Sequence, residues 1–101
     1  MSYLRRNRTE VNYRREAKGR ECQIRIPYKC CGDPETVVLC HLPSHGMGTK
    51  SPDIHAAWGC VSCHNIVDGR DNTDYPPELL KLWFHEGVIR TQQILIDEGK
   101  L

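Results

Sequence analysis

The amino-acid sequence predicts a small α+β domain that a metal-binding cysteine knuckle holds together. Three observations lead to this prediction. Leu, Ile, Val and Phe number only 22 among 101 residues, close to the level below which a chain stays unfolded. Six cysteines offer the cross-link that such a small core lacks. Short β-branched stretches come first along the chain and helical patterns follow, which is the order of an α+β protein.

The basic residues gather at the start of the chain. Residues 1–25 contain eight basic and three acidic side chains, whereas residues 65–101 contain four basic and seven acidic ones. We interpret residues 1–18 as a basic arm, with at most a short helix, and residues 19–101 as the domain. Clustered arginines favour phosphate contacts, and a solvated arm without a partner is the simpler alternative. The candidate nucleic-acid-binding residues are Arg5, Arg6, Arg14, Arg15 and Arg20.

Two classes of protein are excluded by the apolar pattern. No apolar run approaches the ~20 residues of a membrane-spanning helix. No apolar segment follows the arginines of residues 1–8, so we expect no signal peptide and a cytoplasmic protein. In that reducing compartment cysteines bind metal more often than they form disulfides. Residues 60–64 also match the haem c pattern C-x-x-C-H, but covalent haem attachment follows export, so no haem is expected.

Two strands are expected in the first half of the domain. Residues 22–26 (CQIRI) alternate apolar and polar side chains as a short strand does, and Pro27 ends it. Residues 36–42 (TVVLCHL) are β-branched and apolar, which predicts a second, partly buried strand. Residues 43–52 are rich in Gly, Pro and hydroxyl side chains, which predicts a long loop.

Helices are expected in the second half. Residues 60–68 predict a knuckle that runs into a short helix, which ends at Gly69. Residues 78–86 carry leucines and aromatics at helical spacing, and residues 88–98 continue the pattern. Gly87 lies between them, and the sequence leaves open whether one helix or two result.

The cysteines have the spacing of a structural zinc site. Cys60 and Cys63 stand three positions apart, so that their thiolates can converge on one tetrahedral Zn²⁺. A second pair must complete the site, and Cys22 with Cys30 is the best candidate because a tight turn can fold one beside the other. Cys31 can replace Cys30. In the simpler alternative, Cys22 and Cys30 are ordinary buried thiols.

A second group of polar residues lies next to the knuckle. His41 ends the second predicted strand, and His64 directly follows Cys63. Asp68 lies four residues after His64, on the same face of a helix, and imidazole with carboxylate is half a site for a divalent cation. Together the three suggest phosphodiester hydrolysis, in which His41 accepts a proton from water while a cation stabilises the developing charge. A structural role for His41 and a surface hydrogen bond between the helical pair are the alternatives.

The sequence resembles the HNH, or ββα-metal, nucleases. The resemblance lies in the order of three features: a histidine in a strand, a long loop, and C-x-x-C-H-N at the start of a helix. The whole string resembles more closely the small prophage-encoded YbcO-like nucleases. The matching segments cover roughly residues 19–93 and read GRECQIRIP, GDPETVVLCHL, GTKSPD, CVSCHNIVDGR and EGVIRTQ.

This resemblance implies a β-hairpin and a helix around one divalent cation. His41 then matches the general base, His64 a metal ligand and Asp68 a second helix ligand. The implied catalytic cation is Mg²⁺ or Mn²⁺, with Zn²⁺ or Ni²⁺ as alternatives, beside the structural Zn²⁺.

The sequence departs from the HNH pattern at two positions. Many such nucleases carry an acidic or histidine ligand directly before the base, where Cys40 stands here. The middle asparagine has no evident counterpart, and His55 is the first candidate to replace it, with Asp53 as the second.

The function that these observations favour is metal-dependent endonucleolytic hydrolysis of DNA. A zinc-stabilised nucleic-acid-binding module with an inactive site is one alternative, and a structural interaction protein is another. The sequence leaves open whether the DNA is duplex, single-stranded or branched, and in which oligomeric state the protein acts.

Overall fold

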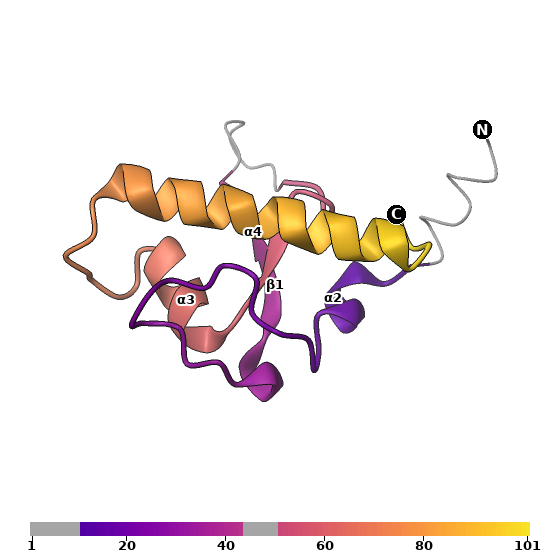
Figure 1. The fold of residues 1–101 in the computed structure, drawn as a ribbon, viewed down its shortest axis with the longest axis horizontal. Coiled ribbons are helices and arrows are strands. Elements are labelled where there is room, and N and C mark those ends of the chain that lie inside the picture. Colours follow the sequence, from indigo (N-terminus) through magenta and orange to yellow (C-terminus); the bar gives the residue numbers. More distant parts are fainter. Residues whose placement is uncertain (1–10, 44–50) are drawn as a thin grey trace.

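The computed structural model describes residues 11–43 and 51–101, and it confirms a small α+β domain. A long helix, α4, crosses a two-stranded hairpin along the length of the molecule, and a short helix, α3, lies beside the hairpin (Figure 1). The described elements in chain order are α2 (Tyr13–Glu16), the 3₁₀ turn η1 (Pro34–Thr36), β1 (Val38–His41), β2 (Ala56–Gly59), α3 (Val61–Val67) and α4 (Pro77–Asp97).

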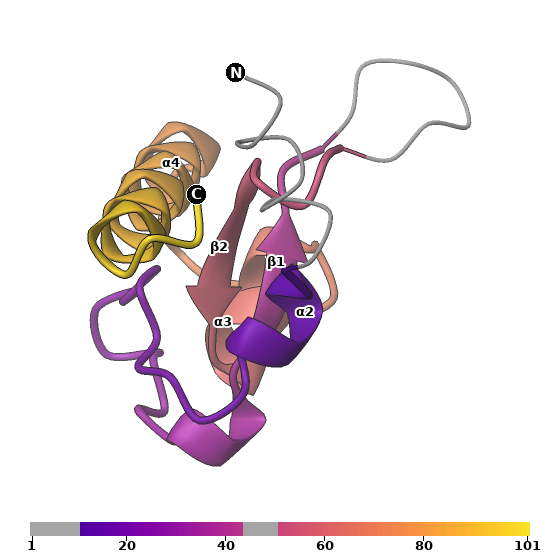
Figure 2. The same ribbon diagram turned by 90° about the vertical axis from the view of Figure 1, so that its right-hand side faces the viewer.

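The sheet is an antiparallel hairpin of β1 and β2, in which His41 lies opposite Ala56 and Leu39 opposite Trp58. The prediction of a strand within residues 36–42 is confirmed. Strand β2, whose sequence is AAWG, was not expected, because alanine and glycine have low β-propensity. All four of its residues are buried, and it lies between α4 and β1 (Figure 2). Burial rather than propensity therefore makes this segment a strand.

The prediction of a strand at residues 22–26 is wrong. This segment belongs to no sheet, and the backbone turns at Arg25, where φ is 57°. Ile24 and Ile26 are fully buried, which explains the apolar alternation in the sequence. One hydrogen bond, from Gln23 N to Trp58 O at 2.7 Å, ties the segment to β2.

The short helix α3 begins at the knuckle, as the sequence predicts. Cys60 is its N-cap, and the Cys60 Sγ accepts a hydrogen bond from the Cys63 backbone N–H at 3.4 Å. The helix ends at Val67, and Gly69 follows with φ of 81°, a conformation that glycine adopts without steric cost.

A single helix, α4, spans both segments that the sequence predicts as helical, and Gly87 lies inside it. A Cβ at Gly87 would lie 3.0 Å from Gln23 O and 3.1 Å from Ile24 Cα. The glycine therefore lets α4 pack directly on the backbone of the 22–26 segment. On the same buried side, Thr91 Oγ1 accepts a hydrogen bond from the Trp58 backbone N–H at 3.0 Å.

Part of the expected basic arm packs into the domain. Tyr13 and Ala17 lie in the hydrophobic core, and the Tyr13 hydroxyl donates to Lys100 O at 2.6 Å. The boundary between arm and domain at residue 18 stays a prediction. Within the part of the chain that the structure describes, no helix combines the length and the apolar character needed to cross a bilayer.

Candidate functional site

Four cysteine side chains lie close together at the N-terminal end of α3. The Sγ atoms of Cys22, Cys30, Cys60 and Cys63 all lie within 4.8 Å of one another, and the pair from Cys60 and Cys30 is 3.7 Å apart. Sulfur atoms around a tetrahedral Zn²⁺ lie about 3.8 Å apart, because each Zn–S bond is about 2.3 Å long. The four thiols therefore fit a structural zinc ion.

Two different local structures bring the cysteine pairs together. Cys60 and Cys63 come from the first turn of α3. Cys22 and Cys30 come from the loop between α2 and η1, and this loop bends where Arg25 and Tyr28 have positive φ.

Cys30, rather than Cys31, lies in the cluster. The Cys30 N–H donates to Ile26 O at 2.9 Å, which closes the turn that carries its thiol. Cys31 is exposed, and its Sγ lies 3.6 Å from Thr36 Oγ1. The alternative that the sequence left open is decided by this turn.

Cys22 and Cys63 oppose each other's ionisation because they share a hydrogen bond. The hydrogen bond between Cys63 and Cys22 lowers the pKa of Cys22 to about 4 and raises the pKa of Cys63. Burial raises the pKa of Cys30 to about 11. A bound dication removes this conflict because it stabilises every thiolate that contacts it. Cys40 lies outside the cluster in the core, where burial raises its pKa to about 12.

The predicted polar residues meet at a separate hollow of about 490 Å³. His41 reaches it from the end of β1, and His64 and Asp68 reach it from α3. Arg14 and Arg70 also line this hollow, which we call the His41 hollow. Positions far apart in the sequence therefore supply imidazoles, a carboxylate and two cations to one surface.

Asp53 fixes the orientation of the His41 ring. The distance between His41 Nε2 and Asp53 Oδ1 is 2.7 Å. An ionised carboxylate only accepts hydrogen bonds, so Nε2 carries the hydrogen and the lone pair of the neutral ring lies on Nδ1. The Asp53 side chain thus orients the His41 ring.

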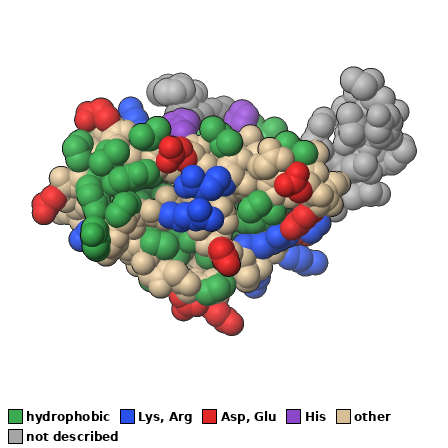
Figure 3. All heavy atoms as spheres, viewed as in Figure 1, with side chains coloured by type: hydrophobic (Ala, Val, Ile, Leu, Met, Phe, Trp, Pro, Cys, Tyr) green, Lys and Arg blue, Asp and Glu red, His purple; other side chains and the backbone are tan. Residues whose placement is uncertain are grey.

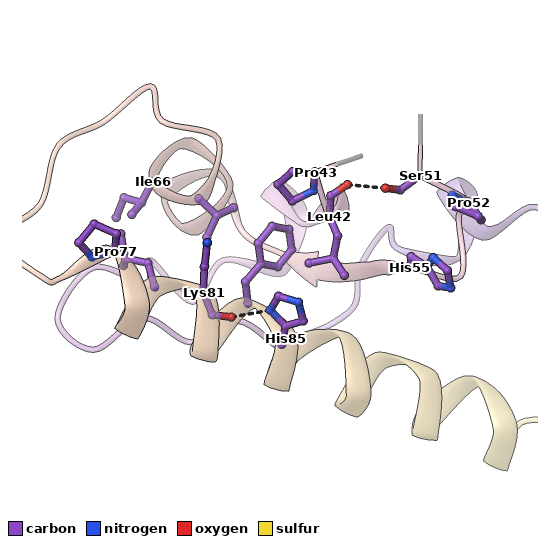
Figure 4. Close-up of a pocket in the computed structure, with 12 residues that line it drawn as sticks. Leu42, Pro43, Ser51, Pro52, His55, Ile66, Pro77, Lys81 and His85 are labelled. Carbon is purple, nitrogen blue, oxygen red and sulfur yellow. Dashed lines mark hydrogen bonds between the residues drawn. The ribbon is translucent and has the colours of Figure 1, made fainter. Parts of the chain in front are cut away.

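His55 does not lie beside His41. The Leu42 N–H donates to His55 O at 3.0 Å, so His55 continues β2 opposite Leu42. Successive side chains of a strand point to opposite faces, which turns His55 away from His41. His55 is exposed and lines a second hollow (Figure 4). Of the two candidates for the middle residue, the structure brings only Asp53 to His41.

Comparison with known proteins identifies the family. The sequence model of the family described as "Putative nuclease YbcO" matches residues 11–100. The chain belongs to the YbcO family. A relative named "Putative nuclease YbcO" from Escherichia coli (strain K12) is 44% identical over 95 residues, which cover 88% of this chain and 95% of the relative. A relative of the same description from Enterobacteria phage 82 has the same identity and coverage.

A solved structure shares the fold. It is described as the structure of a putative bacteriophage protein from Escherichia coli str. K-12 substr. MG1655. It is 41% identical to this chain, with a TM-score of 0.75, and the match covers 87% of this chain and all of the other.

The five arginines proposed to contact nucleic acid have different environments in this YbcO-family chain. Arg14 is exposed and lines the His41 hollow, and Arg15 is exposed on α2. The Arg20 guanidinium lies 4.5 Å from the centre of the Trp58 ring and forms ion pairs with Glu16 and Glu98. Arg5 and Arg6 lie outside the described residues.

Arg70 was not singled out in the sequence, although it lines the His41 hollow. Its Nε lies 3.0 Å from Asp68 Oδ2. The signal that could have found it is its place directly after Gly69, since the glycine ends α3 and leaves the next side chain beside the C-cap Asp68.

Proposed function

We propose that this chain is a metal-dependent endonuclease that hydrolyses DNA phosphodiester bonds in the His41 hollow. The observation that carries the proposal is that His41, His64 and Asp68 line one hollow while Asp53 holds the His41 ring. The names of the relatives support a nuclease-like function. A prophage origin and the cytoplasm, where thiols remain reduced, are parts of the same proposal.

His41 acts as the general base in this scheme. Asp53 accepts the hydrogen on Nε2, which leaves Nδ1 free to take a proton from a water molecule. The water oxygen attacks the phosphorus, the P–O bond to the leaving oxygen breaks, and that oxygen takes a proton from solvent. The ionic contact with Asp53 stabilises the imidazolium formed on His41. Arg14 and Arg70 offer positive charge to the phosphate in the same hollow.

His64 and Asp68 would hold the catalytic cation, which is Mg²⁺ or Mn²⁺ in the main proposal and Zn²⁺ or Ni²⁺ in the alternative. Their donor types fit, since one imidazole nitrogen and one carboxylate meet at the hollow. Among the described residues only the four cysteines form a set of three or more clustered ligands. Water and substrate phosphate would complete the shell, as they do for Mg²⁺ at many sites. Such a cation supplies positive charge to the leaving oxygen and the phosphate.

We also propose that this chain is a member of the HNH superfamily. A hairpin that carries the base is followed directly by a helix that carries the cation ligands, which is the arrangement expected of a ββα-metal site.

The decisive experiment is nicking of supercoiled plasmid by zinc-loaded protein that has been dialysed free of other divalent cations. We expect nicking only after Mg²⁺ or Mn²⁺ is added. His41→Ala should lower the rate about 100-fold or more, and Asp53→Asn should lower it while DNA affinity is retained. Ile89→Ala, which changes an exposed side chain of α4 outside the hollow, is the control and should nick at the wild-type rate. Nicking that persists in His41→Ala would show that the site is wrong.

A second candidate function is a DNA-binding module with an inactive site. The observation that favours it is Cys40, which stands directly before the proposed base but is buried in the core and supplies no ligand. DNA binding that weakens steeply with salt, without nicking under any of the four cations, would identify this function instead.

A further inference from the structure

A larger groove opens on the other side of the β1 end. Its volume is about 720 Å³, and its walls are apolar. Figure 3 shows hydrophobic side chains gathered around the N-terminal half of α4, with histidine side chains near the upper edge. Figure 4 shows the groove itself between α3, α4 and the end of the hairpin. Its apolar walls include Leu42, Pro43, Ile66, Pro77, Leu80 and Phe84.

One cation and three other polar residues of the described chain line the groove. His55, Lys81 and His85 line it beside the apolar walls, and Ser51 is the remaining polar residue. Ser51 donates to Leu42 O at 2.6 Å. The His85 Nδ1 donates to Lys81 O at 2.8 Å, which orients the ring (Figure 4). None of the described residues that line the groove carries a carboxylate, so the charge that its described lining offers to a ligand is the positive charge of Lys81.

The groove lies next to the His41 hollow. Leu42, Ser51 and Val67 line both, and Leu42 directly follows His41 in the chain. A flexible polymer whose phosphate lies beside His41 can therefore place its next unit in the groove.

We propose that the groove receives an unstacked base of the DNA strand whose phosphate lies in the His41 hollow. This inference rests on the proposed function and adds the substrate class. Apolar walls suit the faces of a base, and Lys81 at the rim suits a phosphate. The volume lies within the range of small-ligand pockets. A base stacked in a regular duplex cannot enter, so the substrate contains single-stranded DNA next to the cleaved bond.

Two leucines of α4 provide a matched test. Leu80 lines the groove, whereas Leu82 lies two residues further along α4, is 52% exposed and does not line it. We compare Leu80→Glu with Leu82→Glu by fluorescence anisotropy, using a labelled single strand and a blunt duplex of the same sequence. Leu80→Glu should weaken binding of the single strand about tenfold or more and leave the duplex nearly unchanged. Leu82→Glu should leave both close to wild type.

Leu80 is half-buried, so the Leu80→Glu variant can fail to fold. Variants of exposed groove residues therefore provide a second test. Lys81→Glu and His85→Ala change exposed side chains and should also lower the ratio of single-strand to duplex affinity. A single strand that carries one 5-iodouracil should crosslink under light to the peptide that contains Phe84 and His85.

Three results would overturn the inference. The first is equal single-strand affinity of the Leu80 and Leu82 variants, which would mean that the groove serves another occupant, such as an apolar protein segment. The second is an equal loss for single strand and duplex, and the third is a crosslink outside the groove. In these cases wild-type nicking still supports the proposed function. If the wild-type protein neither binds nor nicks any DNA, the proposed function fails and this inference fails with it.

Discussion

At the scale of single residues, neighbours in the sequence have unrelated roles. Cys30 lies in the cysteine cluster, and Cys31 is exposed beside Thr36. The hydrogen bond from the Asp33 backbone N–H, together with the one between Thr36 Oγ1 and the Cys31 Sγ, lowers the pKa of Cys31 to about 7. The difference arises from the turn that Cys30 closes onto Ile26.

This difference predicts opposite effects of two adjacent substitutions. Cys30→Ser should lose most of the bound zinc and much of the stability, because metal-binding energy in such domains is folding energy. Cys31→Ser should keep one zinc per chain and the wild-type urea midpoint. Metal analysis and urea unfolding check both, and zinc loss in the Cys31 variant alone would reverse the assignment.

At the scale of elements, α4 owes its position to the residue that weakens it as a helix. Gly87 costs about 1 kcal/mol of helix propensity relative to Ala, yet α4 continues through it without a break. The backbone of Gln23 and Ile24 lies within 3.0–3.2 Å of the place that a Cβ would occupy. This contact between Gly87 and the backbone of residues 23 and 24 also holds the segment that begins with Cys22 against α4.

Gly87→Ala should therefore destabilise the protein despite its higher helix propensity. We expect a net loss of about 1–3 kcal/mol in the free energy of unfolding, because the obstructing atoms are backbone and cannot rotate away. Ile89→Ala changes an exposed side chain on the same helix and should be close to neutral. Urea unfolding of both variants measures this, and a more stable Gly87→Ala variant would contradict the packing argument.

At the scale of the whole molecule, charged residues join the two ends of the described chain. Arg20 contacts Glu16 and Glu98, and Lys100 contacts the same two carboxylates. The hydrogen bond from Arg20, with that from Lys100, lowers the pKa of Glu98 to about 2. The Tyr13 hydroxyl, bonded to Lys100 O, adds a further tie between α2 and the C-terminal end.

The lowered pKa of Glu98 predicts an acid-dependent contribution to stability. Because its pKa is lower in the folded state than in the unfolded chain, the contribution is present above about pH 4.5 and is lost as the pH falls toward 2. The difference in melting temperature between wild type and Glu98→Gln should thus be largest near neutral pH and shrink below pH 4. A pH-independent difference would show that the charge is not responsible. High salt should reduce the effect because solvent reaches these partly exposed groups.

The sequence by itself determined the features that depend on local spacing. The knuckle of Cys60 and Cys63, the helix α3 with His64 and Asp68 on one face, and the helical pattern before and after Gly87 follow from periodicity and end signals over a few residues. The resemblance to the YbcO family also rests on short sequence segments of this kind.

Only the tertiary structure decided which distant segments meet. It placed β2 opposite β1, selected Asp53 rather than His55 as the partner of His41, and assigned Arg20 to ion pairs with Glu16 and Glu98. The physical reason is that these outcomes depend on contacts across many residues. Alternating apolar residues at 22–26 indicate burial, but burial alone does not say whether a sheet or the close approach of α4 provides it.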